Sequence, residues 1–283
     1  MPTAATGDLL RRAQADGYAV AAFNVIGIEH AQAIVGGAEL AHAPVILQLS
    51  ENAVRYHLGA VAPIGRACAE LAGAAAVPVA LHLDHATTLD LCERAVAVGF
   101  SSVMLDVADL PFAENVRRTV ELAEWAHARG IGVEAGLGIV GGKDGAVTSA
   151  AGLTDPSAAR AYVAATGADA LAVAVGTSHG MRQRTARIDL DLVARLRAAT
   201  AVPLVLHGSS GVPDADLAAA ATRGIAKINL ATLLNIAFTA ALRDALAADP
   251  AAVDPRPYLA AARGAVRALV ANRLRLLGAA GRA

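Results

Sequence analysis

The sequence predicts an α/β protein that folds as a closed (β/α)₈ barrel with an extra helix at its C-terminus. Short apolar runs alternate with longer Ala-rich segments along all 283 residues. Eight such alternations fit one barrel, because parallel barrel strands are buried on both faces and read as continuous apolar runs. An open doubly wound sheet is the competing fold, but its usual G-x-G-x-x-G turn does not follow the first apolar run. We therefore expect a single barrel domain over residues 1–283.

The expected strands are the short apolar runs, and the expected helices are the Ala-rich segments between them. The strands span Ala19–Asn24, Val45–Ser50, Val79–Leu83, Ser102–Asp106, Ile131–Ala135, Ala170–Val175, Leu204–His207 and Ile225–Asn229. The helices span Glu29–Ala41, Leu89–Val98, Glu114–Arg129, Pro156–Thr166, Leu190–Ala199 and Asp214–Thr222. A start such as Thr154-Asp155-Pro156 carries the capping residue and the proline that typically open a helix.

Two further helices are expected after the eighth strand, over Leu230–Ala248 and Pro257–Leu277. A (β/α)₈ barrel needs only one of them. We therefore expect residues 250–283 to form a C-terminal helical extension that packs against a second subunit in a homodimer or homotetramer.

Composition narrows the classes of function. The chain is 55% apolar and 17% charged, with a formal net charge of −1. This balance does not favour nucleic acid, and the arginines between Arg256 and Arg275 read as a solvated helix face. The N-terminus has no apolar signal core, no apolar run reaches the ~20 residues of a membrane span, and Cys68 and Cys92 form no paired motif. We expect a cytoplasmic protein that acts on a small molecule, with no nucleic-acid or membrane partner.

Polar residues gather at the carboxyl ends of the expected strands, where a (β/α)₈ barrel builds its active site. Reading those ends gives Asn24, Ser50, Asp84, His85, Asp106, Glu134, His179, His207 and Asn229. A chain so rich in alanine, valine and leucine places few polar residues there by chance. The carboxyl end of the barrel is therefore the expected site.

Three of these residues, His85, His179 and His207, predict a catalytic metal ion. Three imidazoles with an open fourth position form catalytic zinc sites, whereas four protein ligands form structural ones. Gly180 and Gly208 follow two of the histidines and let the backbone approach a bound ligand closely. One such histidine alone would read as a buried core residue, but three at equivalent strand ends favour the metal.

Asp84 stands directly before His85 and is the expected general acid or base. The alternative role for this carboxylate is to orient a histidine from behind. His82 lies inside the strand, and strict alternation of side chains turns it away from His85.

A phosphate site is expected after the seventh and eighth strands. Gly208-Ser209-Ser210-Gly211 follows the seventh strand, and Asn229-Leu230-Ala231-Thr232 follows the eighth and opens a helix. Free backbone N–H groups and the helix dipole both favour an anion at this place in a barrel. Arg184 is expected to add a cation for the phosphate, the alternative being a solvated surface arginine. A plain turn is the alternative for the Gly-Ser-Ser-Gly segment.

Together these motifs resemble the class II fructose-bisphosphate/tagatose-bisphosphate aldolase family. The resemblance runs from Ala22-Phe23-Asn24 to the terminal Gly281-Arg282, so it covers nearly the whole chain. The motifs that carry it are Leu81–His85, Pro111–Asn115, Gly176–Gly180, Val205–Ser210 and Lys227–Thr232. Because several spaced motifs occur in the right order, the resemblance is specific.

The resemblance implies a role for each residue of the site. His85, His179 and His207 would bind zinc. Asp84 would donate a proton to the aldehyde carbonyl. The residues implied to hold dihydroxyacetone phosphate or a similar ketone are Gly180, Gly208, Ser209, Ser210, Asn229, Ala231 and Thr232, with Asn24 and Ser50 in the same pocket.

The implied reaction is reversible retro-aldol cleavage of a phosphorylated ketose to dihydroxyacetone phosphate and an aldehyde. Zinc would polarise the ketone carbonyl and stabilise the enediolate that forms as the bond breaks. Asp106 and Glu134 match acidic positions of the family that bind metal. In some members the position of Asp106 belongs to a secondary site for a divalent or monovalent cation.

The chain departs from the family pattern in the glycine-rich segment Gly136–Gly152, which we expect to be a working lid or an insert. Gly136 stands where the family carries a second glutamate, and Lys143-Asp144 stands where it carries Glu-Asp. Asp144 is the expected substitute for the glutamate that moves protons on the ketone carbon. These departures keep open a specialised or degenerate barrel that binds metal and a sugar phosphate with altered or no aldol activity. A metal-independent Schiff-base lyase on Lys227 is the other alternative.

Overall fold

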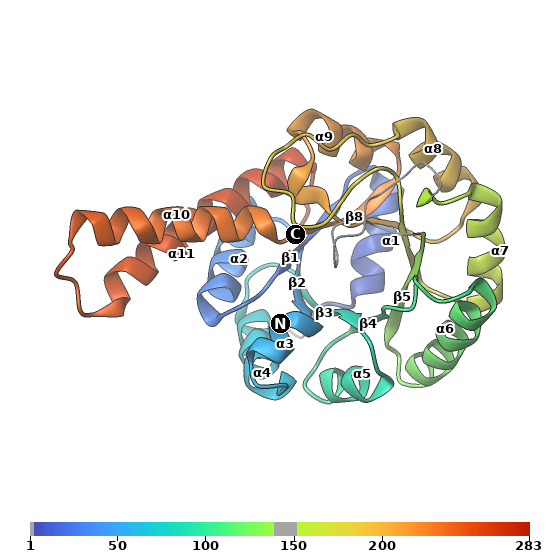
Figure 1. Ribbon diagram of the computed structural model, residues 1–283, viewed down its shortest axis with the longest axis horizontal. Helices are drawn as coiled ribbons and strands as arrows, with labels where there is room; N and C mark the ends of the chain where they lie inside the picture. Colours follow the sequence, from blue (N-terminus) through green and yellow to red (C-terminus); the bar gives the residue numbers. More distant parts are fainter. Residues whose placement is uncertain (1–2, 139–151) are drawn as a thin grey trace.

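A computed structural model describes residues 3–138 and 152–283, and its strands close into one parallel barrel in chain order (Figure 1). The strands are β1 (Val20–Asn24), β2 (Val45–Ser50), β3 (Val79–Ala86), β4 (Ser102–Leu105), β5 (Gly132–Leu137), β6 (Ala170–Val173), β7 (Leu204–Leu206) and β8 (Ile225–Leu230). The barrel closes where β1 pairs with β8 in parallel. The predicted fold class is confirmed, and every predicted strand overlaps an observed one.

Most of the helices pack around the outside of this barrel (Figure 1). The helices are α1 (Thr6–Asp16), α2 (Ile28–Ala41), α3 (Glu51–Tyr56), α4 (Val61–Ala74), α5 (Leu89–Val96), α6 (Phe112–His127), α7 (Pro156–Thr166), α8 (Leu190–Ala199), α9 (Asp214–Arg223), α10 (Thr232–Ala248) and α11 (Pro255–Leu276). The bounds predicted for α7 and α8 match the observed ones, whereas α1, α3 and α4 were not predicted. The core between sheet and helices is filled with small aliphatic side chains, which suits a barrel with few aromatic residues.

Helix α1 covers the amino-terminal end of the barrel. Ala4 N–H donates to the carbonyl of Val79 at the start of β3, at 2.9 Å. Ser102 Oγ, at the start of β4, donates to Thr6 Oγ1 at 2.8 Å. With this end closed by packed side chains, the carboxyl ends of the strands remain as the end of the barrel open to a ligand.

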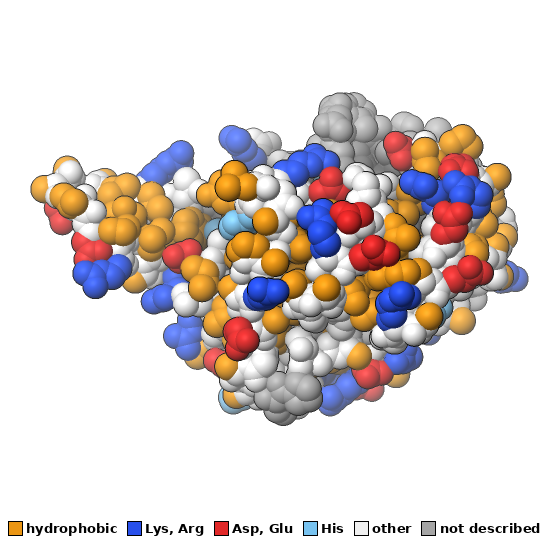
Figure 2. Space-filling model, turned by 90° about the horizontal axis from the view of Figure 1, so that it is seen from below, with side chains coloured by type: hydrophobic (Ala, Val, Ile, Leu, Met, Phe, Trp, Pro, Cys, Tyr) orange, Lys and Arg blue, Asp and Glu red, His pale blue; other side chains and the backbone are white. Residues whose placement is uncertain are grey.

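Helices α10 and α11 form a hairpin that projects beyond the barrel beside α2, and we call it the arm (Figure 1). Although α10 is largely apolar in sequence, Leu234 is its only buried residue. Hydrophobic side chains gather on the surface of the arm, seen in orange at the projecting end of Figure 2. Residues 250–283, expected as the C-terminal extension, contain α11 and so supply one of the two helices of the arm. Among the residues that the structure describes, no helix is both long enough and apolar enough to cross a membrane.

The carboxyl-terminal half of α11 lies against α2 at two adjacent glycines. A Cβ on Gly37 would stand 2.7 Å from the backbone oxygen of Arg267 and 2.7 Å from Val270 Cβ. A Cβ on Gly36 would meet only the side chain of Arg267, with Nε at 3.1 Å. Gly37 therefore sets the distance between α2 and α11, whereas Gly36 faces a side chain that can move away.

We predict opposite effects for alanine at these two positions. Gly37→Ala should lower the free energy of unfolding by about 1–3 kcal/mol, because the added methyl group overpacks the contact between the helices. Gly36→Ala should leave it unchanged or raise it by up to about 1 kcal/mol, since alanine is the better helix former. Urea unfolding of both variants beside the parent chain measures the difference. An equal loss of stability in both would contradict the close approach at Gly37.

Candidate metal centre

A cavity of about 600 Å³ opens at the carboxyl ends of the strands. The predicted site residues within the described part of the chain all line this cavity, except Glu134 and Arg184. Asp144 lies outside the described residues. The cavity is also lined by five residues that were not predicted from the sequence to belong to the site: Gln48, Glu51, Asn52, Arg55 and Thr87.

Strand β3 brings both Asp84 and His85 to this cavity through a local irregularity. The register of β3 against β4 shifts between Leu83 and Ala86, and His85 adopts a φ of 55°. In a regular strand two neighbouring side chains point to opposite faces, so only a bulge lets both reach the same site. A left-handed conformation of a residue other than glycine costs of order 1–3 kcal/mol and tends to occur at functional sites.

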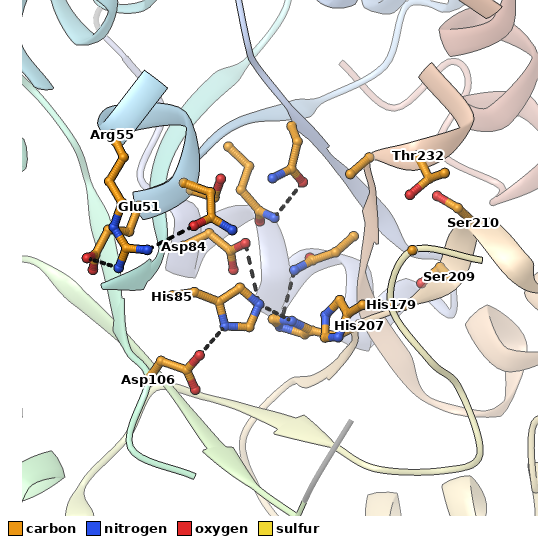
Figure 3. A pocket seen from close by; sticks show the side chains of 18 of the residues that line it. Glu51, Arg55, Asp84, His85, Asp106, His179, His207, Ser209, Ser210 and Thr232 are labelled. Carbon is orange, nitrogen blue, oxygen red and sulfur yellow. Dashed lines mark hydrogen bonds and ion pairs between the residues drawn. The ribbon is translucent and has the colours of Figure 1, made fainter. Parts of the chain in front are cut away.

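Three imidazole rings converge above the barrel interior, as Figure 3 shows for His85, His179 and His207. Their ring centroids lie 4.8–5.8 Å apart. One nitrogen from each ring lies within 4.8 Å of the other two. The structure therefore brings the three predicted ligands together at one point.

Carboxylates behind two of the rings determine which nitrogens face that point. Asp106 Oδ2 lies 3.0 Å from Nδ1 of His85, and Glu134 Oε1 lies 2.8 Å from Nε2 of His207. Because an ionised carboxylate only accepts hydrogen bonds, each of these ring nitrogens carries the proton. His85 Nε2 and His207 Nδ1, which hold the lone pairs, then face each other at 3.1 Å. A cation between them relieves this arrangement, so the donors present fit a metal ion that takes nitrogen ligands.

Glu134 also belongs to a second group of potential ligands, together with His82 and Asp84. However, the ammonium group of Lys227 already contacts Glu134 Oε2 at 2.6 Å. A metal ion at this second group would be close to that positive charge. The geometry therefore favours the three histidines as the metal site and puts Glu134, predicted as a ligand, behind His207.

His82 lies inside the barrel beneath the cavity. Its Nδ1 is 2.7 Å from Ser102 Oγ, and its Nε2 is 3.6 Å from Glu134 Oε2. Burial, with a further contribution from the charge of Lys227, lowers the pKa of His82 to about 3. His82 is therefore neutral and does not serve as a counter-charge for the carboxylate.

Asp84 is buried at the floor of the cavity, with Oδ2 3.6 Å from His85 Nε2. Burial by itself would raise the pKa of Asp84. Electrostatic interaction with the neighbouring imidazoles of His85 and His207, and then with the ammonium group of Lys227, outweighs burial and lowers the pKa of Asp84. Asp84 Oδ1 has no hydrogen-bond partner among the described residues. The side chain is thus an ionised carboxylate with one oxygen available to accept a proton.

The seventh and eighth strands supply the predicted phosphate end of the cavity. Gly208 has a φ of 68°, and a Cβ there would stand 2.7 Å from the backbone of Ser178, so only glycine fits. Ser210 Oγ accepts from Leu233 N–H in the first turn of α10, at 3.2 Å. Ser209, Ser210 and Thr232 lie together on one side of the histidines (Figure 3). A turn of backbone N–H groups beside a helix start is a favourable place for an anion.

The opposite side of the cavity is formed by α3, which begins directly after β2 (Figure 3). Glu51 accepts from the backbone of Thr87 at 2.6 Å and from Arg55 at 2.6 Å. Ser50 caps this helix, since its Oγ accepts from Ala53 N–H at 3.3 Å. Had the polar segment after β2 been interpreted as a helix, the sequence would have indicated Glu51 and Arg55 as residues of the site.

One predicted role, that of Arg184, and one alternative, a Schiff base on Lys227, do not match the positions of the side chains. The guanidinium of Arg184 donates to the carbonyl of Val212 at 2.9 and 3.0 Å and pairs with Asp214, so it does not reach the cavity. Lys227 is fully buried with its amino group on Glu134, so it is not presented to a substrate as a Schiff-base lysine would be. The chain's other lysine, Lys143, lies outside the described residues.

Comparison with known proteins agrees with this geometry over the whole chain. Residues 4–282 match the family model described as "Fructose-bisphosphate aldolase class-II". The fructose-bisphosphate aldolase of Geobacillus stearothermophilus is 40% identical over 278 residues, covering 98% of this chain and 97% of that protein. The fructose-bisphosphate aldolase of Thermus caldophilus is 42% identical over 302 residues, covering 98% of each.

Solved structures extend the agreement from sequence to fold. The crystal structure of the YdjI aldolase from Escherichia coli K12 superposes with a TM-score of 0.88 at 33% identity, over 100% of both chains. The family expected from the motifs is therefore confirmed. The chain belongs to the class II fructose-bisphosphate aldolase family, and the protein is an aldolase, a carbon–carbon lyase.

Proposed function

We propose that this protein is a zinc-dependent aldolase that reversibly cleaves a phosphorylated ketose into dihydroxyacetone phosphate and an aldehyde. One observation carries the proposal: carboxylates behind His85 and His207 turn a lone pair of each ring toward the other, at 3.1 Å. His179 supplies the third imidazole, and three histidines with an open position are typical of catalytic zinc. Asp106 and Glu134 are proposed to orient the ligands; at Asp106 a secondary cation is also proposed.

The chain's own residues account for binding and proton transfer. The Gly208–Ser210 turn and the start of α10 bind the phosphate, while Asn24 and Ser50 line the same cavity and orient the hydroxyl groups. A zinc ion would act as a Lewis acid that stabilises the negative charge developing on the ketone oxygen as the carbon–carbon bond breaks. After cleavage, the carbon of the ketone fragment that carried the broken bond must gain a proton. We propose that this proton comes from Asp144.

Asp84 acts first as a base in the cleavage direction. Its lowered pKa keeps it ionised, and its Oδ1 accepts the proton from the hydroxyl group of the carbon that becomes the aldehyde. In the condensation direction the same oxygen returns the proton. Positioned proton transfer of this kind typically contributes about 10²–10⁴-fold to the rate.

A second candidate is a member of the same family with altered or no aldol activity. Gly136 stands where the family resemblance implies a second glutamate. It is buried, and a Cβ there would meet Met104 Cε at 3.3 Å. An apolar neighbourhood thus replaces a carboxylate beside the site. This observation favours a specialised substrate over loss of metal binding, since the histidines are unaffected.

We further propose that two copies associate through the arm. Three large apolar residues on or next to its helices are exposed to solvent. The exposed fractions are 42% for Ile236, 37% for Leu246 and 90% for Val253. Such a run of exposed apolar residues on a projecting hairpin is typical of a surface that another subunit covers. Cys68 and Cys92 are buried free thiols, in keeping with the proposed location in the reducing cytoplasm.

The proposed reaction predicts cleavage that depends on the metal. A panel of phosphorylated ketoses is assayed with the zinc-loaded protein, with chelator-treated protein and with treated protein resupplied with zinc. We expect at least one ketose to be cleaved, the activity to vanish on chelation, and zinc to restore it. Full activity in the metal-free protein would contradict the proposal. Tight phosphate-ester binding without exchange of the ketone's α-proton would favour the second candidate.

The matched control for this assay is Asp84→Asn. It keeps the shape of the side chain and removes the base, so kcat should fall about 10²–10⁴-fold while zinc content stays near that of the parent protein. An unchanged kcat would contradict the proposed role of Asp84 as the base.

The exposed apolar residues of the arm predict an interface between two subunits. Leu246→Asp should shift the protein to a smaller species in analytical ultracentrifugation, because a charge placed in an apolar interface disfavours association. Leu58→Asp is the control and should not change the sedimentation, because Leu58 is 97% exposed and lies between α3 and α4, outside the two helices of the arm. A monomeric parent protein, or no effect of Leu246→Asp, would contradict the role of the arm.

A further inference from the structure

Lys227 is an unexplained charge in the barrel interior. Its side chain is fully buried, and its amino group lies beneath the cavity without lining it. Burying an ammonium group is costly unless a paired charge and hydrogen bonds compensate it. The reaction proposed above does not use this lysine, so its position needs another reason.

The partner of Lys227 is Glu134, which has a different contact on each carboxylate oxygen. Lys227 Nζ donates to Oε2 at 2.6 Å, and His207 Nε2 lies 2.8 Å from Oε1. Lys227 lies on β8, Glu134 on β5, and His207 directly after β7. The carboxylate therefore connects a strand on one side of the barrel with a ring at the metal site.

Two groups compete for Nε2 of His207. Glu134 Oε1 at 2.8 Å accepts a proton from it, whereas the side-chain nitrogen of Asn229, at 3.1 Å, would donate one to it. If Nε2 carries the proton, Nδ1 faces the other histidines with a lone pair; if Nε2 accepts, Nδ1 carries the proton and is blocked. The carboxylate oxygen of Glu134 is the nearer of the two groups, so its position against Nε2 favours the first of these forms of the ring.

Among the described residues that contact Glu134, Lys227 alone brings a positive charge. His82 is neutral: Ser102 Oγ gives its proton to Thr6 Oγ1, so it accepts from His82 Nδ1 at 2.7 Å. His82 Nε2 is left as an acceptor, 3.6 Å from Glu134 Oε2. Lys227 is thus the group that fixes the carboxylate in place as an acceptor.

We propose that Lys227 is a positioning residue of the metal centre: by holding Glu134 against Nε2 of His207, it makes Nδ1 the nitrogen that binds the metal. The proposal rests on the metal site of the proposed function. It assigns to this lysine a role through two other side chains rather than contact with the substrate. In metalloenzymes, loss of such a partner of a ligating histidine typically reduces metal affinity about 10–100-fold.

The test uses a pair of neutral replacements, Lys227→Met together with Glu134→Gln, in the full chain. Neither charge is left unpaired, so the double variant should unfold near the parent in urea. An amide can either accept from Nε2 or donate to it, so His207 is no longer held in one form. We expect zinc affinity, measured by chelator competition, to fall about 10–100-fold, and the visible absorption spectrum of the Co²⁺-loaded protein to change.

Ser102→Ala is the control, because Ser102 contacts His82 and not His207. It should keep the parent's zinc affinity and Co²⁺ spectrum. If the double variant does not fold, Lys227→Met alone, which removes both the positive charge and the N–H donor from Glu134, is measured in the same way with the same expected result. Parent-like zinc affinity and spectrum in a folded variant would overturn the proposal and leave a structural ion pair.

Metal binding by the parent protein distinguishes a failure of this proposal from a failure of the proposed function. If the parent chain binds neither zinc nor Co²⁺, the metal-dependent function fails before any variant is compared. If the parent binds both and the variants bind equally well, only the role of Lys227 fails.

Discussion

The hydrogen bonds that Asp106 and Glu134 accept from His85 and His207 are the interactions on which the rest of the site depends. They fix the proton of each ring on its outer nitrogen and leave the inner nitrogens with lone pairs at close distance. Such a pair of inner nitrogens is unfavourable alone and favourable around a cation. The choice between an ordinary polar barrel end and a metal centre thus depends on two carboxylates that need not touch the metal.

The backbone at His85, one of the proposed metal ligands, is conformationally strained. His85 is one of the few non-glycine residues with positive φ among the described residues, and it lies where β3 loses register with β4. This conformation lets Asp84 and His85, neighbours in the chain, serve the same cavity. Strain of this kind persists where the surrounding structure holds it, and here the hydrogen bond to Asp106 and the buried floor around Asp84 do so.

Much of the barrel and of its proposed metal ligands follows from the sequence, because both depend on simple repetition. Buried parallel strands read as apolar runs, and their carboxyl ends mark the active site, so His85, His179 and His207 stand out in an Ala-rich chain. The bulge in β3 could not be predicted, since a period of two turns neighbouring side chains to opposite faces. A one-residue departure from that period is visible only in the backbone.

Other residues could not be assigned because sequence position does not give the contacts of a side chain. Arg184 follows His179 closely in the chain, yet its guanidinium is held by Val212 and Asp214. Lys227 shares a strand face with Asn229, which is compatible with a Schiff base until its ion pair with Glu134 is seen. The short helix α3 adds Glu51 and Arg55 from a segment too brief to show helical periodicity.

We propose above all that three histidines bind one metal ion, with His207 bound through Nδ1. Anomalous diffraction at the zinc absorption edge, from crystals of the zinc-loaded protein, tests it most directly. We expect one strong peak bonded to His85 Nε2, His179 and His207 Nδ1, with Glu134 in contact with His207 and not with the metal. A peak bonded to Glu134 or to His207 Nε2, or no peak at the histidines, would contradict it.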